Sequence, residues 1–277
     1  MKGLNAAVAV MILSVFSVVI SIYAEESKEP YEAETQKEVI LQHAEEPAVS
    51  GSVSADIMST YVWRGQTLSN AFVIQPAVSV SYGVFGASIW GNYDSDKVET
   101  TSGSDSGHGE FNEMDFTLSY ARTVSNFTVG GGYIYYAFDG ANDTQEVYLS
   151  GTYNGMFSPA LTVYYDYDEG NGAFVIASVS HAFDLPQKMS LKLGASASYN
   201  IRNKIMGVDE DGERFSNFYN GELTSSLVIP LTDHISVTPK VAYSFPLSSE
   251  AKDAISAISN DNKKDIVYGG INLTLSF

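Results

Sequence analysis

The last nine residues of the chain, GGINLTLSF, alternate between apolar and polar side chains. Going backward from Phe277, apolar residues or glycine occupy every second position as far as Val267, with small or polar residues between them. This spacing gives a β-strand one apolar face and one polar face. Such a strand suits a soluble sandwich as well as a membrane barrel, so other features of the chain must distinguish the two.

The N-terminus has the features of a secretory signal peptide over residues 1–24. Lys2 precedes an apolar run over residues 6–22, and the small residue Ala24 marks the expected cleavage point. A transmembrane anchor is the alternative, but no basic stop-transfer cluster follows the run. No other segment approaches the roughly 20 consecutive apolar residues of a spanning helix. If the exported chain is embedded in a membrane, it must therefore be a barrel.

Composition excludes several classes of protein and site. The chain has no cysteine, which rules out a disulfide framework, a lipoprotein anchor and thiolate metal sites. Its net charge of -18 argues against a nucleic-acid partner, because phosphate backbones are bound by basic surfaces. Residues 25–50 are rich in Glu and poor in aromatic residues, which predicts a flexible acidic leader in the periplasm.

From residue 51 onward, short alternating segments are separated by Gly, Asn, Asp and Pro. We expect twelve strands, at residues 51–63, 71–82, 84–93, 111–123, 126–138, 144–154, 158–167, 172–183, 188–200, 219–230, 234–247 and 264–277. The connections between them alternate between short turns and longer loops. Bacterial outer-membrane barrels have this asymmetry, with the short turns in the periplasm.

The polar faces of these segments carry too few charges for a water-facing exterior, so we place them in a lumen. Aromatic residues gather at the expected strand ends, where interfacial girdles lie in membrane barrels. They are Tyr61, Tyr82, Tyr93, Tyr120, Phe183, Tyr199, Phe245 and Phe277.

The predicted fold is an all-β, transmembrane, antiparallel up-and-down barrel of twelve strands over residues 51–277. We expect it in the outer membrane, in contact with lipid and with both mature termini periplasmic. Phe277 is expected to be the signal read by the barrel assembly machinery.

The first hairpin, SADIMSTYVWRGQTLSNAFVIQPAVSVSYGVFGASIWGNYD, resembles the opening of the TorF family of exported proteobacterial proteins. The positions that match the family pattern are Tyr61, Trp63, Arg64, Gly65, Gln75, Trp90 and Asn92. The resemblance extends over most of residues 51–277 but not over the acidic leader or the acidic stretch at residues 94–110. It implies an outer-membrane barrel whose function is inferred to be pore formation.

We expect neither catalysis nor a cofactor. The four histidines are His43, His108, His181 and His234, and none is placed beside a Ser nucleophile and a third orienting group. The Gly130–Gly132 run has no following helix or Lys, which a phosphate-binding loop requires.

Charged residues at lumen-facing positions are the most informative for function. By alternation the expected pore-lining residues are Asp56, Asp115, Glu146, Asp166, Lys192, Glu222 and Lys240, with Glu113 and Arg64 inward or at the mouth. An acidic excess in a lumen favours cations. The sequence therefore predicts a passive, weakly cation-selective channel for ions or small polar solutes. The alternative is a structural or surface-interaction barrel, in which these charges pair and plug the lumen while the extracellular loops carry the function.

Overall fold

The computed structural model describes residues 49–95, 109–209 and 211–277. The expected signal peptide, most of the acidic leader and most of the acidic stretch at residues 94–110 lie outside this part of the chain. Among the described residues, no helix is long and apolar enough to cross a membrane.

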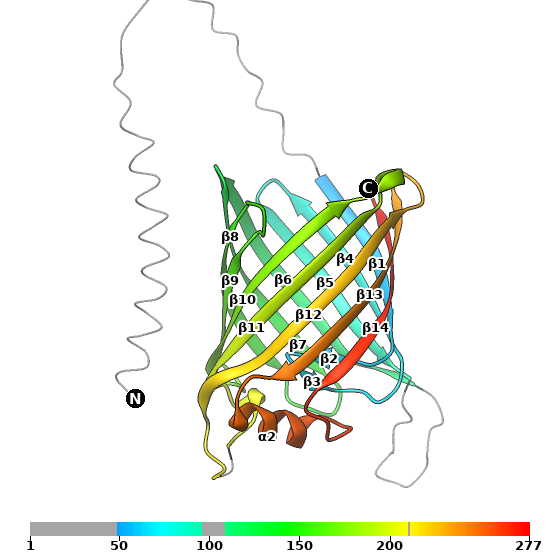
Figure 1. Cartoon of the computed structure of the whole chain (residues 1–277). Helices are drawn as coiled ribbons and strands as arrows, with labels where there is room; N and C mark the ends of the chain where they lie inside the picture. Colours follow the sequence, from blue (N-terminus) through cyan, green and yellow to red (C-terminus); the bar gives the residue numbers. More distant parts are fainter. Residues whose placement is uncertain (1–48, 96–108, 210) are drawn as a thin grey trace, which may run out of the picture. The chain divides into compact units, whose positions relative to one another are not determined.

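Twelve antiparallel strands form a closed barrel, which confirms the predicted fold class (Figure 1). The last strand pairs with the first, in a register that runs from Ser52 opposite Ser276 to Met58 opposite Gly270. The barrel strands are β1 (Val49–Met58), β4 (Val73–Tyr82), β5 (Phe85–Asp94), β6 (Glu110–Val124), β7 (Phe127–Phe138), β8 (Thr144–Tyr153), β9 (Ala160–Asp166), β10 (Gly172–Asp184), β11 (Ser190–Ile201), β12 (Ser216–Pro230), β13 (Ile235–Pro246) and β14 (Ile266–Ser276).

The connections are sorted between the two ends of the barrel. We call one end the short-turn end; its connections are residues 83–84, 125–126, 154–159, 185–189 and 231–234, and they include the 3-10 helix η1 (Pro186–Lys188). The other is the long-loop end, with connections at residues 59–72, 95–109, 139–143, 167–171, 202–215 and 247–265. The start of β1 and the C-terminus both lie at the short-turn end, at the top of Figure 1.

The exterior of the barrel is apolar. On β14, Ile271 and Leu273 point outward and are each 52% exposed, while Asn272 and Thr274 point inward. Large apolar side chains are likewise exposed on β1, β4, β6, β12 and β13. A soluble monomer does not expose an apolar surface of this extent, because burial of such groups drives folding in water. The barrel is therefore a transmembrane one.

The first predicted strand, residues 51–63, is too long at its C-terminal end. β1 ends at Met58, and residues 59–72 turn into the barrel mouth, where β2 (Val62–Trp63) and β3 (Gln66–Thr67) form a small hairpin. The assignment of Tyr61 to the lipid-facing girdle is wrong, because its side chain is buried against Trp90 with 5.7 Å between ring centroids.

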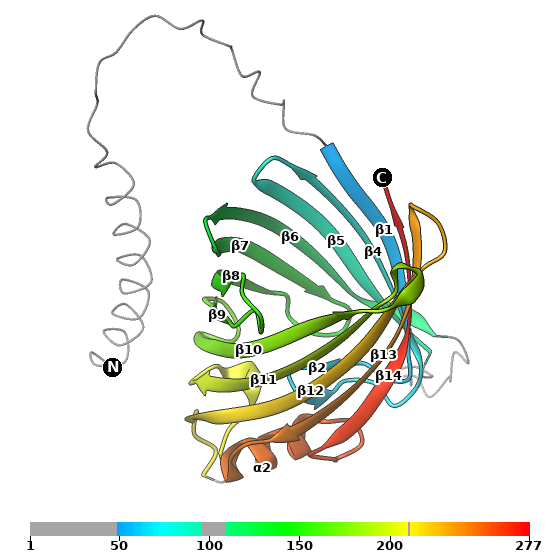
Figure 2. The same cartoon turned by 45° about the horizontal axis from the view of Figure 1, so that its top comes forward.

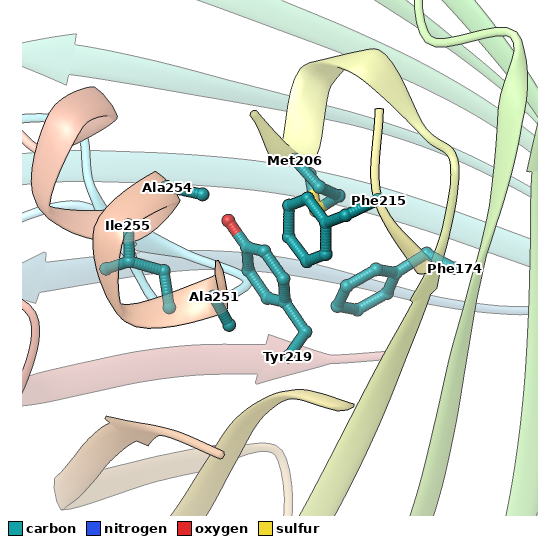
Figure 3. Packing of buried hydrophobic residues seen from close by; sticks show 7 residues of the cluster. All are labelled: Phe174, Met206, Phe215, Tyr219, Ala251, Ala254 and Ile255. Carbon is teal, nitrogen blue, oxygen red and sulfur yellow. The ribbon is translucent and has the colours of Figure 1, made fainter. Parts of the chain in front are cut away.

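A helix in the last long loop was also not predicted. α2 (Ser249–Ile258) begins after Ser248, whose hydroxyl accepts a hydrogen bond from the Ala251 amide as an N-cap. One face of α2 packs against residues of β10, β12 and the 202–215 connection, which contains the 3-10 helix η2 (Lys204–Met206). The cluster comprises Phe174, Met206, Phe215, Tyr219, Ala251, Ala254 and Ile255, and Figure 3 shows Tyr219 between the helix and the two phenylalanines.

Ile271 and Asn272 provide a test of the lipid-facing assignment. Ile271→Arg places a charge in lipid near the middle of β14 and should lower the free energy of unfolding by about 2–4 kcal/mol. The matched variant Asn272→Lys points into the lumen and should change stability much less. Denaturant unfolding in lipid vesicles measures both; equal losses would contradict the assignment of faces.

Phe277 provides a second test. Its backbone exchanges two hydrogen bonds with Gly51, at 2.8 and 3.0 Å, and its ring is 66% exposed on the outer face. Deletion of Phe277 and Phe277→Ala should both lower the yield of folded protein in the outer membrane, since the substitution removes the ring and keeps the backbone pairing. Heat-modifiable mobility in electrophoresis measures folding, and Ser276→Ala is the control. Normal yield from both Phe277 variants would refute the role of the ring in assembly.

Candidate functional site

Small polar side chains line the lumen in the half of the barrel nearer the short-turn end. On β1 and β4, Ser50 and Ser52 pair across the strands with Ser81 and Ser79, and each pair of hydroxyls is 2.8 Å apart. The same inward face continues around the wall with Gly86, Ser88, Thr117, Ser119, Thr128, Gly130, Ser150, Thr152, Thr162, Ser178, Ser180, Gly194, Ser196, Thr224 and Ser226. Eight strands already give an interior that side chains can fill, so the short side chains of this half reach only part of the way across a twelve-stranded barrel.

The mouth at the long-loop end is different, because residues 59–72, here called the inner loop, fold across it. Gln66 donates a hydrogen bond to the Tyr219 hydroxyl on β12 at 3.0 Å, and Ser69 donates to Asp94 on β5 at 2.8 Å. The amide of Thr67 donates to the Ser259 hydroxyl after α2 at 3.0 Å. The inner loop is thus held from several sides of the barrel. In Figure 2 its β2–β3 hairpin lies within the ring of strands near α2.

A buried ion pair joins the inner loop to the wall. The Arg64 guanidinium donates two hydrogen bonds to the Glu146 carboxylate on β8, at 2.8 and 2.7 Å. The two side chains are only 6% and 2% exposed, and the Tyr136 hydroxyl donates a third bond to Glu146 at 2.9 Å. Burial acts to lower the pKa of Arg64, but the adjacent Glu146 charge outweighs it, and the pKa is raised overall. Arg64 therefore remains a cation in the mouth.

Aromatic rings enclose the same guanidinium. Its central carbon lies 4.4 Å from the centroid of Trp63, 4.7 Å from that of Tyr164 and 4.6 Å from that of Phe174. Cation–π contacts of this kind contribute most where water is excluded. Arg64 has a positive φ of 49° and Gly65 one of 85°, so the tight β2–β3 turn projects the arginine between the rings.

All seven expected pore-lining residues are on the inward face of their strands, although several are already paired or bonded. Asp56 and Lys240 form an ion pair at 2.7 Å across the intervening strand β14. Glu222 accepts a hydrogen bond from Tyr268 at 2.8 Å. Asp115 lies opposite Trp90 and Tyr136, and Lys192 lies opposite Ser226 and Ala182 in the short-turn half.

The remaining two, Glu146 and Asp166, are buried at the long-loop end. Asp166 accepts from the Thr144 hydroxyl at 2.8 Å and from the amides of Asp168 and Gly170 at 2.9 and 3.0 Å. Its carboxylate therefore stabilises the turn after β9, while Glu146 holds the inner loop.

The residues that carry the TorF resemblance converge on the mouth. Tyr61, Trp63, Arg64 and Gly65 are in the inner loop, and Trp90 supports Tyr61 from β5. The two other matching residues continue this support, since Gln75 donates to Asn92 at 3.0 Å and Asn92 donates to Asn112 at 2.8 Å. The predicted strand at residues 51–63 wrongly includes Tyr61 and Trp63, and Gln66, Ser69 and Tyr136 were not predicted to belong to the site. An arginine between an aromatic residue and a glycine was the available signal for a turn.

Of the four histidines, only two lie in the described part of the chain. His181 is on the outward face of β10, and His234 is exposed in the 231–234 turn.

The comparisons with known proteins find similarity among solved structures. No family model matches the chain, so the TorF resemblance is not confirmed, and no curated protein matches either. Among solved structures, a KdgM porin is 13% identical with a TM-score of 0.49, covering 82% of this chain and 99% of its own. A NanC porin is 12% identical with a TM-score of 0.45, covering 82% and 98%. The COG4313 outer membrane channel from Pseudomonas putida F1 is 12% identical with a TM-score of 0.46, covering 90% and 99%.

The Arg64–Glu146 pair predicts how the inner loop can be released. Arg64→Met leaves a buried carboxylate without its counter-charge, which typically costs about 3–5 kcal/mol. The cysteine-free chain allows Ser69→Cys as a reporter, because Ser69 is fully buried. We expect Arg64→Met to accelerate maleimide labelling of this cysteine at least about tenfold.

Two further variants make this test specific. Arg64→Met combined with Glu146→Leu should restore protection, because no charge then remains buried alone. Lys240→Met breaks the more exposed ion pair and should leave labelling unchanged. If Arg64→Met does not change labelling either, the ion pair does not hold the loop.

Proposed function

We propose that this protein is an outer-membrane channel through which ions or small polar solutes diffuse passively, with both mature termini in the periplasm. It would reach the membrane through the barrel assembly machinery and require no cofactor. The observation that carries the proposal is the lining of the short-turn half, where small polar side chains face inward from a wall that is apolar outside. A lumen of this kind favours water and polar solutes.

A weak preference for cations is part of the proposal. The positive charges of Arg64 and Lys240 are matched by Glu146 and Asp56. The inward carboxylates of Glu113, Asp115 and Glu222 have no basic partner among the described residues. Lys192, in the short-turn half, carries a charge of the opposite sign. The unmatched charge near the long-loop mouth is therefore acidic, and rings of such charges attract cations.

The competing function is a structural or surface-interaction barrel. The inner loop crosses the mouth, and α2 and the 202–215 connection pack around it, which favours a plug. Single-channel recording in a planar bilayer separates the two functions. Discrete conductance steps by the purified protein support the channel, and their absence in folded protein supports the plugged barrel.

Selectivity can be tested within the same recordings. Asp115→Asn with Glu222→Gln removes two unmatched carboxylates and should shift the reversal potential in a salt gradient toward that of anions. Asp233→Asn makes the same kind of change at an exposed turn of the short-turn end and should have no effect. An unchanged reversal potential in a double variant that still conducts would show that these carboxylates do not control the permeating ions.

A further inference from the structure

The long-loop mouth contains a cavity of about 580 Å³ beside the inner loop. Its walls come from the inner loop, the mouth-side ends of β6 and β7, the 139–143 connection and the segment around η2. Cavities of this volume are typical of sites for small organic ligands.

One side of this cavity is aromatic. Tyr136 and Phe138 stack with 6.3 Å between centroids and 5° between planes, and Trp63 meets Tyr136 edge-on at 6.2 Å. All three line the cavity, together with Tyr61. Such a wall can hold the apolar part of a ligand, and its ring faces attract cations.

The charges in the cavity are unevenly matched. Glu146 is neutralised by Arg64, and Glu169 lies 3.7 Å from Lys204. Glu113 is different: it is only 7% exposed, and no described basic residue pairs with it. Its carboxylate interacts with the Tyr61 hydroxyl and with Asp115, two residues along the same inward face of β6.

The neighbouring Asp115 has a hydrogen-bonding atom that is not satisfied. Its Oδ1 atom is buried and has no hydrogen-bond partner among the described residues. Ionising such a buried carboxylate pair without a cation is costly, because neither charge would be compensated for its lost hydration. A positively charged donor placed at Glu113 would supply that compensation.

We propose that this cavity binds an organic cation, with an ammonium or guanidinium group at Glu113 and an apolar body against Tyr136 and Phe138. This inference rests on the proposed channel, because it names the class of solute that the mouth selects. A metal ion would not use the aromatic wall, and a neutral solute would offer no counter-charge to the carboxylate pair. Only a molecule that joins a cationic group to an apolar group can contact both the carboxylates and the aromatic wall.

The probe is 2-phenylethylammonium, compared with the neutral 2-phenylethanol, and binding is measured by isothermal titration calorimetry on the full chain in neutral detergent. We expect the cation to bind at least about tenfold more tightly than the alcohol, as hydrogen bonds to charged groups allow. Glu113→Gln, which keeps the side-chain shape, should abolish this difference. Asp139→Asn is the matched control, because Asp139 also lines the cavity but is exposed. Phe138→Leu should weaken both probes.

Equal affinity for the two probes, or unchanged cation binding by folded Glu113→Gln, would overturn the proposal. Planar-bilayer conductance in potassium chloride is recorded separately on the same preparation. Conductance without cation binding refutes the cavity site and leaves the channel standing. Cation binding without conductance supports the site and refutes the channel.

Discussion

Backbone hydrogen bonding in a bilayer is the constraint on which this structure depends. Lipid offers no partner to an unpaired N–H or C=O group, so a sheet can span a membrane only if it has no free edge. β1 meets this requirement by pairing with β4 on one side and with β14 on the other. Closure through an even number of antiparallel strands also brings the first strand's start and the C-terminus to the same end. With the edges removed, side-chain alternation alone separates the lipid face from the lumen.

A second interaction, between Arg64 and Glu146, organises the mouth. Two buried charges are expensive to dehydrate, and they are tolerated here because the geometry is bidentate, Tyr136 adds a hydrogen bond, and aromatic rings surround the guanidinium. The inner loop is consequently attached to the far wall by a bond that fails if either partner is lost. The barrel thus combines a half lined by short polar side chains with a mouth built from packed and paired ones.

The sequence predicted the barrel strands much better than it predicted the contacts at the mouth. The predicted boundaries of β4, β7 and β8 agree with the structure to within a few residues, because each is an alternating segment between turn residues. Alternation also predicted that Asp56 and Lys240 share the inward face. It could not show that they pair, because their strands are separated by β14 and their contact depends on the stagger of the barrel.

The positions of the inner loop and α2 could not be predicted from the sequence pattern. The predicted first strand runs on to Trp63, yet β1 ends at Met58, and Gln66, Thr67 and Ser69 beyond it find their hydrogen-bond partners inside the mouth. The sequence by itself determined the barrel, its strand count and the faces of its strands, since these follow from a period of two and from turn residues that act locally. Only the tertiary structure decided which loop enters the lumen and which charges meet there. Those outcomes depend on contacts between segments far apart in the chain, and no local period records them.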